Sequence, residues 1–297
     1  MNPDSRERVL ILGGTGMLGH EAVRTFARSY EVHTSVRSPE SAEVFGLPAT
    51  LHRFDAFEPA ALPGLLDFVA PSLVLNCIGI VKQLEDANRP LPAIALNSLF
   101  PHQVAAACAA RGCRLIHVST DCVFSGSLPL GQAYTEQDVA DARDLYGLTK
   151  LLGEVTEPPG LTIRTSIIGW ELTRGVGLLA WFAAQDGKEV QGYTNAVFSG
   201  LTTRALSGLL VEVSRSYPEL AGLYHVSADP ITKFDLLHLL RDRLDLDTTI
   251  RPVDEPTVNR ALDSRRFTQE TGLTAPSWTK MLDDYLARER ELDEAKA

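Results

Sequence analysis

Tyr146 and Lys150 stand four residues apart in the stretch Y-G-L-T-K, a spacing that can perform acid–base chemistry. On a helix, this spacing places the phenol and the ammonium group on one face, one turn apart. A phenol with a reference pKa of about 10 is a slow acid–base catalyst at neutral pH, and a nearby cation favours its ionised form. The pair therefore predicts a tunable proton donor. Because an isolated Y-x-x-x-K is more often a surface tyrosine beside an ordinary lysine, the surrounding sequence has to decide.

A glycine-rich loop follows the apolar run Val9–Leu12 and precedes a helix-compatible segment. Its G-x-x-G-x-x-G spacing is a variant of the dinucleotide fingerprint, in which the backbone turns tightly and approaches the pyrophosphate. The helix N-terminus behind it supplies free N–H groups and the positive end of a dipole. A tight turn without a ligand is the alternative, but strand, glycines, helix and second strand occur in the required order. We expect the following loop residues to contact the cofactor: Gly13, Thr15, Gly16, Met17, Leu18 and Gly19.

The end of the second apolar run bears on the choice between NAD and NADP. An acid at this point holds the ribose 2′-hydroxyl of NAD, but residues 34–38 read T-S-V-R-S. Arg37 and Ser38 can bind a 2′-phosphate through charge-assisted hydrogen bonds, unless Arg37 is only a solvated loop charge. The sequence therefore favours NADP(H) over NAD(H). We expect Asp55, after the third run, to meet the adenine amino group.

These motifs lie on a regular alternation of strand-like and helix-like segments, which is typical of a parallel sheet with crossover helices. The predicted fold class is α/β: a Rossmann-type doubly wound parallel sheet with a smaller C-terminal α/β substrate-binding lobe. The predicted strands are Val9–Leu12, Glu31–Val36, Leu51–Phe54, Leu73–Asn76, Leu115–Val118, Leu161–Ile168 and Leu223–Val226. The predicted helices are Met17–Arg28, Pro59–Val69, Ala93–Ala110, Thr203–Ser214 and Lys233–Arg243.

The alternation decays after Ile168 into a region rich in turns, which suggests two lobes. We expect residues 1–168 to form the NADP-binding Rossmann domain, with about 196–228 returning to it. Residues 169–195 and 229–297 are expected to form the smaller substrate-binding lobe. Within that lobe, Trp181 and Phe182 are expected to pack its interior rather than to stack on a base.

Composition narrows the classes of partner. The chain has 297 residues, 44% of them hydrophobic and 22% charged, as in ordinary globular proteins. A formal charge of -10 argues against general affinity for nucleic acid or anionic membranes. The four cysteines lack paired C-x-x-C spacing, so we expect free thiols and no metal site. The first apolar run is too short for a signal sequence or a membrane span, which leads us to expect a cytoplasmic protein. A homodimer is compatible with the sequence.

Several motifs in a fixed order resemble the extended short-chain dehydrogenase/reductase superfamily. They are the glycine loop, N-C-I-G at residues 76–79, Asn97, S-T-D at residues 119–121, and the pair Tyr146 and Lys150. Residues 119–124 and 144–147 look most like the dTDP-4-dehydrorhamnose reductase branch, a sugar-nucleotide-binding branch that acts on nucleotide-activated 4-keto-6-deoxysugars. The stretch N-R-A-L-D-S at residues 259–264 and P-S-W at 276–278 add to this likeness.

The resemblance implies roles for individual residues. Tyr146 would protonate the nascent alkoxide, Lys150 would hold the nicotinamide ribose and lower the pKa of the tyrosine, and Thr120 would hydrogen-bond the carbonyl oxygen. Tyr146 and Lys150 would thereby also contact the cofactor. Further residues expected at the cofactor are Cys77, Ile78, Gly79, Asn97, Ser119 and Thr165. Residues expected near the sugar nucleotide are Lys82, Asp121, Cys122, Val123, Trp170, Arg174, Asn195 and Arg260. Those outside the run 121–123 could each equally be solvated surface residues.

The residue at position 122 separates the possible reactions. Related 4,6-dehydratases have a Thr-Asp-Glu run whose glutamate removes a proton, whereas this chain has Cys122, and a neutral thiol is a poor base. We therefore expect NADPH-dependent reduction of a nucleotide-linked keto sugar. The reductase motif itself has a tyrosine where Cys122 stands, which leaves the sugar open. Two alternatives stay open as well: a nucleotide-sugar epimerase with retained NAD(P), and a non-catalytic NADP-binding regulatory subunit resembling the β subunit of methionine adenosyltransferase.

Overall fold

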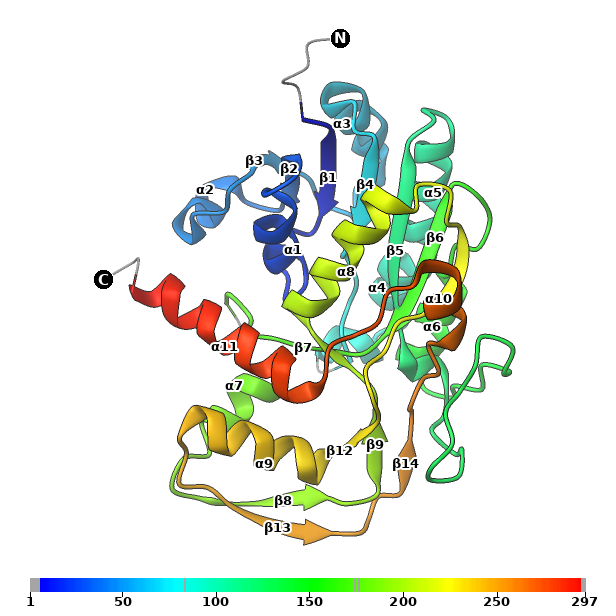
Figure 1. Ribbon diagram of the computed structural model, residues 1–297. Helices are drawn as coiled ribbons and strands as arrows, with labels where there is room; N and C mark the ends of the chain where they lie inside the picture. Colours follow the sequence, from blue (N-terminus) through cyan, green and yellow to red (C-terminus); the bar gives the residue numbers. More distant parts are fainter. Residues whose placement is uncertain (1–5, 83, 174, 176, 295–297) are drawn as a thin grey trace.

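The computed structural model describes residues 6–82, 84–173, 175 and 177–294. Its centre is a sheet of seven parallel strands in the order β11-β6-β5-β4-β1-β2-β3 (Figure 1). Strands β1 to β6 have the order of the doubly wound arrangement predicted from the sequence. The predicted strand near residues 223–226 is β11, which adds a seventh strand at one edge. The strands are β1 (Arg8–Leu12), β2 (Glu31–Val36), β3 (Thr50–Arg53), β4 (Leu73–Asn76), β5 (Arg114–Thr120), β6 (Gly160–Thr165) and β11 (Gly222–His225).

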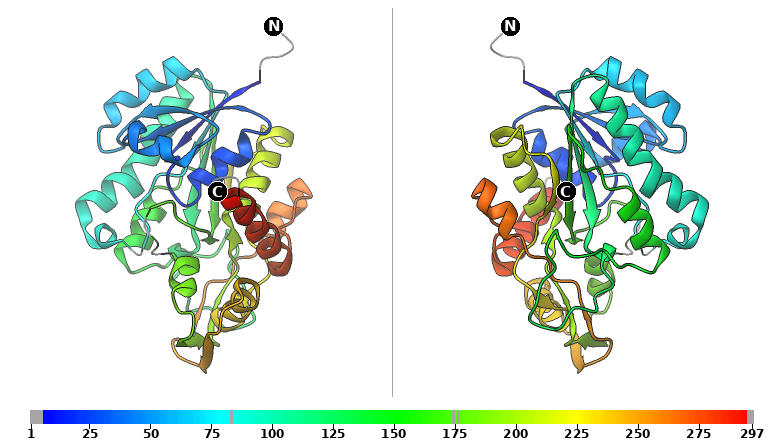
Figure 2. Two further views of the ribbon diagram at one scale, coloured as in Figure 1. Left: turned by 90° about the vertical axis from the view of Figure 1, so that its left-hand side faces the viewer. Right: turned by 90° about the vertical axis from the view of Figure 1, so that its right-hand side faces the viewer.

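Helices cover both faces of this sheet (Figure 2). In β1, Val9 and Ile11 pack on one side with α1 and α8, while Leu10 and Leu12 pack on the other with α3 and α5. All four side chains are fully buried, which explains why β1 reads as a continuous apolar run rather than an alternating one. The helices of these two layers are α1 (Gly19–Phe26), α3 (Leu62–Val69), α5 (Phe100–Ala109) and α8 (Thr203–Ser216).

Two predicted segments differ in detail. The run Leu161–Ile168 is not one strand, because the chain leaves the sheet at Ser166, whose carbonyl accepts a hydrogen bond of 2.8 Å from the Leu201 N–H. The continuation, β7 (Ile167–Ile168), pairs in parallel with β10 (Leu201–Thr202). The predicted helix Ala93–Ala110 consists of α4 (Pro90–Ala93), a π-helical turn η4 (Ile94–Leu99) and α5. Single π-helical turns inside helices are frequent at functional sites.

A smaller group of elements lies beyond the C-terminal ends of the large sheet's strands (Figure 1). It contains the pair β8 (Glu189–Tyr193) and β13 (Thr249–Val253), and the triplet β12 (Ile231–Thr232), β9 (Ala196–Phe198) and β14 (Val258–Asn259). Because β9 belongs to this triplet, the chain returns to the large sheet only after Phe198 rather than at about residue 196 as expected. With this boundary moved, we propose the division of the chain into two lobes. The remaining helices are α2 (Pro39–Ala42), α6 (Leu145–Leu152), α7 (Leu178–Ala183), α9 (Lys233–Leu244), α10 (Arg265–Thr271) and α11 (Trp278–Glu294).

The turn between β1 and α1 leaves no room for a side chain at Gly19. A Cβ there would lie 2.0 Å from the Gly13 carbonyl oxygen, a main-chain atom that a rotamer change cannot move. We predict that Gly19→Ala lowers the free energy of unfolding by about 1–3 kcal/mol, the usual cost of overpacking. Gly64→Ala is the matched control, because Gly64 lies in α3 with open space around it. Denaturant unfolding checks both variants; an unchanged midpoint for Gly19→Ala would contradict the close contact.

Candidate active site

Helix α6 brings Tyr146 to the end of β5. Asp144 caps this helix by accepting a hydrogen bond of 2.8 Å from the Gly147 N–H, and Tyr146 and Lys150 both lie within the helix, the condition under which their spacing places them on one face. A Cβ on Gly147 would lie 2.3 Å from the carbonyl oxygen of Cys122. Only glycine allows the helix to approach the turn that follows Thr120 this closely.

Thr120 and Tyr146 form the polar centre of the site. The Thr120 Oγ1 accepts a hydrogen bond of 3.1 Å from the Cys122 N–H and lies 3.2 Å from a carboxylate oxygen of Asp121. Burial raises the pKa of Tyr146 above its ordinary value of about 10, and the hydrogen bond with Thr120 opposes this rise only in part. The tyrosine is therefore a phenol at neutral pH. The pKa of Tyr146 is thus raised rather than lowered as expected, because the effect of burial is larger than that of the hydrogen bond with Thr120.

The ammonium group of Lys150 is buried beside the same strand. Its Nζ donates a hydrogen bond of 2.8 Å to the Val118 carbonyl oxygen. Burial lowers the pKa of Lys150 to about 8, while the carboxylate of Glu154 opposes that change. The loop after β4 is close by, since a Cβ on Gly79 would lie 3.7 Å from Nζ. The lysine thus stands between β5 and the predicted cofactor loop.

The glycine loop has the shape that a dinucleotide requires. Gly13 has φ +88° and accepts a hydrogen bond of 3.0 Å from the Gly16 N–H, while its own N–H donates to the Ser35 Oγ at 3.0 Å. Helix α1 has no side-chain cap at Leu18, so N–H groups at its start are available to an anionic ligand. The loop after β4 lies alongside, because a Cβ on Gly13 would be 3.0 Å from the Ile78 side chain. These residues fit a dinucleotide diphosphate.

The residues predicted to choose the cofactor lie at the ends of β2 and β3. Arg37 is exposed, and no ion pair involves it in the described part of the chain. The Ser38 side chain accepts a hydrogen bond of 3.4 Å from the Ser41 N–H and so caps α2. Asp55 is exposed and accepts a hydrogen bond of 2.9 Å from the Phe57 N–H. Arg37 is thus the available cation at this corner.

Three residues predicted to contact the cofactor form hydrogen bonds within the protein. Asn97, in the π-helical turn, accepts a hydrogen bond of 2.8 Å from the Ile80 N–H and donates one of 3.2 Å to the Ile80 carbonyl. The hydroxyl of Ser119 donates to Glu154 at 2.7 Å, and that of Thr165, which is buried, is directed at the Ser166 carbonyl at 3.3 Å. Their polar atoms are engaged within the protein, and their cofactor contacts stay predictions.

Four of the predicted substrate residues lie in or near the turn after β5. Asp121 is buried and Cys122 partly buried in the turn after β5; burial raises the pKa of the Cys122 thiol to about 12, so it is neutral. Lys82 pairs with Asp144 at 2.8 Å. The guanidinium of Arg260 donates to the carbonyls of Phe124 and Ser125 at 2.9 and 3.0 Å. Lys82 and Arg260 therefore hold this part of the site together as well as bringing positive charge to it.

The other predicted substrate residues are buried or engaged within the fold, or lie outside the described residues. The main-chain N–H of Trp170 donates to the Tyr285 hydroxyl at 2.6 Å, and its ring packs against the larger core. Asn195 lies between β8 and β9, where its carbonyl accepts from the Val258 N–H at 3.0 Å. Val123 is fully buried, which leaves only its main chain available to a ligand. Arg174 lies outside the described residues.

One cation at the site escaped the sequence analysis. Lys233 begins α9, and its positive charge acts on Asp121 and Cys122 in the turn after β5. No local signal identifies it, because only the fold brings the start of α9 near that turn. Lys233 also lines a hollow of about 520 Å³. That hollow is lined by Leu178, Trp181, Gln185, Glu189, Val190, Gln191, Tyr193, Lys233 and Leu237.

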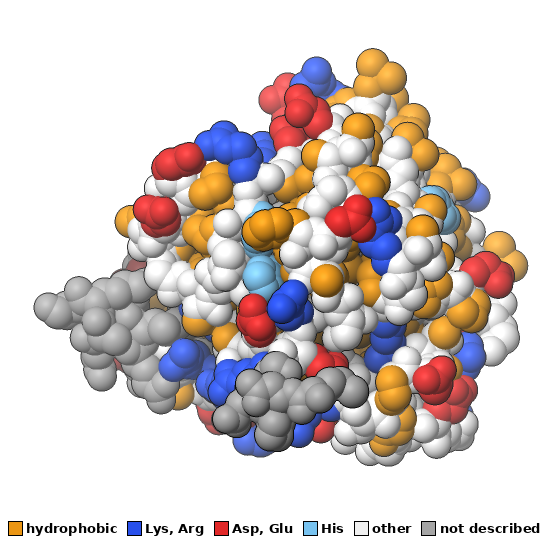
Figure 3. Space-filling model, turned by 90° about the horizontal axis from the view of Figure 1, so that it is seen from above, with side chains coloured by type: hydrophobic (Ala, Val, Ile, Leu, Met, Phe, Trp, Pro, Cys, Tyr) orange, Lys and Arg blue, Asp and Glu red, His pale blue; other side chains and the backbone are white. Residues whose placement is uncertain are grey.

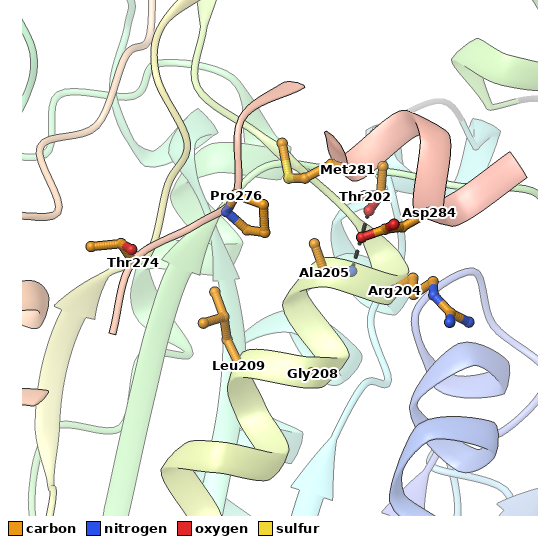
Figure 4. Close-up of a pocket in the computed structure, with 9 residues that line it drawn as sticks. All are labelled: Thr202, Arg204, Ala205, Gly208, Leu209, Thr274, Pro276, Met281 and Asp284. Carbon is orange, nitrogen blue, oxygen red and sulfur yellow. Dashed lines mark hydrogen bonds between the residues drawn. The ribbon is translucent and has the colours of Figure 1, made fainter. Parts of the chain in front are cut away.

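The hollow corrects one expectation about the smaller lobe. Phe182 is fully buried as expected, but Trp181 is 41% exposed and faces this hollow. A second hollow, of about 260 Å³, lies between α8 and α11, where Leu209 and Ala205 face Pro276 and Met281 (Figure 4). None of the predicted site residues lines that second hollow.

The described residues contain no group of three or more His, Cys, Asp or Glu side chains that could hold a metal ion. No helix among them is both long and apolar enough to cross a membrane. On the face seen from above, basic side chains lie beside acidic ones rather than in a field of one sign (Figure 3). Electrostatic attraction on that face is therefore local.

Comparison with protein families gives one match over most of the chain. The family model described as RmlD substrate binding domain matches residues 7–291. dTDP-4-dehydrorhamnose reductase of Streptomyces griseus is 31% identical over 171 residues, which are 56% of this chain and 51% of that protein. The chain thus matches about half the length of this relative. A probable low-salt glycan biosynthesis reductase of Haloferax volcanii, Agl14, is 28% identical over 298 residues, covering 93% of this chain and 95% of that one.

A further relative and two solved structures are also similar to this chain. Methionine adenosyltransferase 2 subunit beta of Mus musculus is 31% identical over 147 residues, which are 50% of this chain and 41% of that protein. Among solved structures, dTDP-4-dehydrorhamnose reductase of Bacillus anthracis in complex with NADP superposes with a TM-score of 0.79 at 18% identity, covering 95% and 99% of the two chains. WbmG of Bordetella bronchiseptica, in complex with NAD and UDP, has a TM-score of 0.77 at 17% identity, covering 97% and 96%. The two structures confirm the fold.

Asn97 generates a prediction about the loop after β4. In Asn97→Ala, the buried N–H and carbonyl of Ile80 lose their partners, which should lower the free energy of unfolding by about 1–3 kcal/mol. Asn88→Ala is the control, because Asn88 is exposed and a surface change of this kind stays within about 0.5 kcal/mol. Urea unfolding measures both. Equal stability of the two variants would show that Asn97 does not anchor this loop.

Proposed function

The chain belongs to the family described as RmlD substrate binding domain. We propose that it is an oxidoreductase that reduces the keto group of a nucleotide-activated 4-keto-6-deoxysugar with NADPH. The observation that carries the proposal is the arrangement of Thr120, Tyr146 and Lys150 at the end of β5 beside the glycine loop. Burial holds Tyr146 as a phenol, the form that can give a proton to a new alkoxide.

The residues of the site divide the work of a ketone reduction. When bound, NADPH supplies the hydride that reduces the carbonyl carbon. Tyr146 donates its proton to the carbonyl oxygen as negative charge develops there. Thr120 offers its hydroxyl to the same oxygen, and the cation of Lys150 stabilises the phenolate that Tyr146 becomes. Stabilisation of charge that appears only during the reaction raises the rate without tightening the binding of substrate.

The cofactor is supported by the loop geometry and by Arg37. The main chain turns tightly at Gly13 and Gly19, and the start of α1 behind this turn has no side-chain cap, which supports a diphosphate bound at its N–H groups. Arg37 is the exposed cation at the end of β2, where a 2′-phosphate of NADP would need one. The carboxylate that would hold the 2′-hydroxyl of NAD is missing from residues 34–38.

Cys122 supports reduction over dehydration. A dehydratase needs a base at this position to remove a proton from carbon. Burial raises the pKa of the Cys122 thiol to about 12, and the neighbouring Asp121 carboxylate adds to the rise. The thiol therefore stays protonated at neutral pH and cannot act as that base.

The hollow beside Lys233 suits the nucleotide part of the substrate. It offers an exposed aromatic side chain, Trp181, and amide side chains such as Gln185 and Gln191. Lys233 connects it to the turn that carries Asp121 and Cys122. A protein with a formal charge of -10 needs local cations to attract an anionic diphosphate, and Lys233, Arg260 and Lys82 provide them.

Tyr146→Phe tests the proposed function. We predict a loss of at least about 100-fold in the rate of NADPH oxidation with a panel of nucleotide 4-keto-6-deoxysugars, because the proton donor is gone. NADPH binding should persist, since the ring remains. Tyr30→Phe is the control. Tyr30 immediately precedes β2, and its hydroxyl lies 2.9 Å from the Ser214 hydroxyl instead of contacting the proposed site.

Each alternative function makes a different prediction for the same proteins. A regulatory subunit would keep its biological effect in Tyr146→Phe, and the wild type would turn over no member of the panel. An epimerase would release stoichiometric NAD(P) on denaturation and consume no NADPH. Either result would overturn the reductase proposal.

Arg37→Ala tests the choice of cofactor. We predict that kcat/KM for NADPH falls about ten-fold or more while kcat/KM for NADH is unchanged, because a charge-assisted hydrogen bond is worth roughly 1.5–3 kcal/mol. Arg215→Ala removes an exposed arginine near the end of α8 and should change neither value. A wild-type enzyme that prefers NADH, or an equal loss with both cofactors, would refute the assignment of Arg37.

A further inference from the structure

A buried ion pair beside the site has no part in the mechanism above. The carboxylate of Glu154 accepts two hydrogen bonds of 2.8 Å from the Nε and Nη2 atoms of Arg164. The two side chains are only 6% and 5% exposed. Burying two charges costs desolvation energy that their attraction repays poorly, so such a pair is weak evidence of stabilisation. Its position next to Lys150 suggests another role.

Strand β5 connects this pair to the reacting residues. The Ser119 hydroxyl donates to the Glu154 carboxylate at 2.7 Å. The residue before it, Val118, offers its carbonyl to the Lys150 Nζ at 2.8 Å, and the residue after it is Thr120, the partner of Tyr146. Three consecutive residues of one strand therefore hold the lysine, the buried carboxylate and the tyrosine in fixed positions relative to one another.

Glu154 is the charged group that acts on Lys150 from nearby. Burial raises the pKa of the Cys77 thiol, at the end of β4, to about 12, and lowers the pKa of His117, on β5, well below its ordinary value. Both groups are therefore neutral, as is the phenol of Tyr146 on the same helix. The Glu154 carboxylate raises the pKa of Lys150 against the effect of burial.

Arg164 in turn holds the carboxylate in place. Its guanidinium donates hydrogen bonds to both carboxylate oxygens of Glu154. One Nη atom lies 3.4 Å from the Nε2 of His225, and the guanidinium carbon lies over the ring of Phe124, 5.2 Å from the ring centroid. Burial lowers the pKa of His225 to about 4, so this histidine adds no competing charge at neutral pH. A guanidinium held on several sides cannot turn away from its carboxylate.

Resting on the proposed reductase function, we propose that Glu154, fixed by Arg164 and Ser119, is a positioning residue that keeps Lys150 cationic next to Tyr146. The four charged or ionisable groups then alternate in sign when the phenol gives up its proton: Arg164 positive, Glu154 negative, Lys150 positive, Tyr146 negative. A neutral lysine would leave the new phenolate without a counter-charge in a buried site.

Titration of Lys150 in the cofactor-free protein tests the proposal. In protein labelled with ¹³C at the lysine ε-carbon, the Lys150 signal is identified by its loss in Lys150→Met. In Glu154→Gln, we expect the pKa of Lys150 to fall from about 8 to about 7 or lower, because an adjacent opposite charge is lost. Glu157→Gln is the control; Glu157 is an exposed carboxylate three residues further on, and its loss should leave the titration unchanged.

Because Glu154→Gln leaves Arg164 buried without its partner, a second variant guards against misfolding. The double variant Glu154→Gln with Arg164→Gln removes both charges and keeps two amides that can hydrogen-bond each other; Lys150 should titrate lower in it as well. In the pH profile of NADPH oxidation, the loss of rate on the alkaline side should move to lower pH in both variants. An unchanged Lys150 titration in a folded variant would show that the pair is structural only.

The titration does not depend on knowing the substrate. If the wild type turns over no keto sugar but Lys150 titrates lower in Glu154→Gln, the proposed function fails and the positioning role stands. If the wild type is active but the titration is unchanged, the opposite conclusion holds.

Discussion

Helix α6 lies against the main chain of its neighbours near both of its ends, and the geometry of the site depends on this contact. At its start, a Cβ on Gly147 would come within 2.3 Å of the Cys122 carbonyl oxygen; after its last turn, a Cβ on Gly153 would come within 1.9 Å of the Asn97 carbonyl oxygen. Two glycines therefore set how deeply the helix is seated. Tyr146 is adjacent to the first glycine and Lys150 lies between the two. Their distance from β5 is therefore fixed by main-chain contact rather than by adjustable side chains.

This close packing creates an electrostatic problem as well as a precise geometry. Burial raises the pKa of Tyr146 and lowers that of Lys150, so both groups are pushed toward their neutral forms. A proton donor gains from this, because a phenol is what ketone reduction consumes. A lysine that must stabilise the product phenolate loses from it. The fold therefore needs a buried negative charge near Lys150, and the carboxylate of Glu154 lies there with its own cation.

The sequence predicts the parts of this arrangement that are local. The strands β2 and β4, the glycine loop and the helix around Tyr146 follow from apolar runs and short spacings, because neighbouring residues decide them. It does not predict partners brought together by packing across the fold. Lys233 acts on a turn more than a hundred residues earlier in the chain, and the apolar run Leu161–Ile168 breaks because Leu201 pairs with Ser166. Glu154 had a signal, its spacing of four from Lys150, but the helix ends before it.

The two groups of elements contribute different things to the proposed reaction. Strand β5 and α6 supply the proton donor and its counter-charges, and nothing in that set distinguishes one keto sugar from another. Lys233, from the smaller group, acts on Asp121 and Cys122 in the turn after β5, and Trp181 lines the same hollow as Lys233. Changes in the smaller group can therefore alter which sugar nucleotide is held without disturbing Tyr146. We propose that the identity of the sugar depends on that turn and on the hollow beside Lys233, while the chemistry depends on the position of α6.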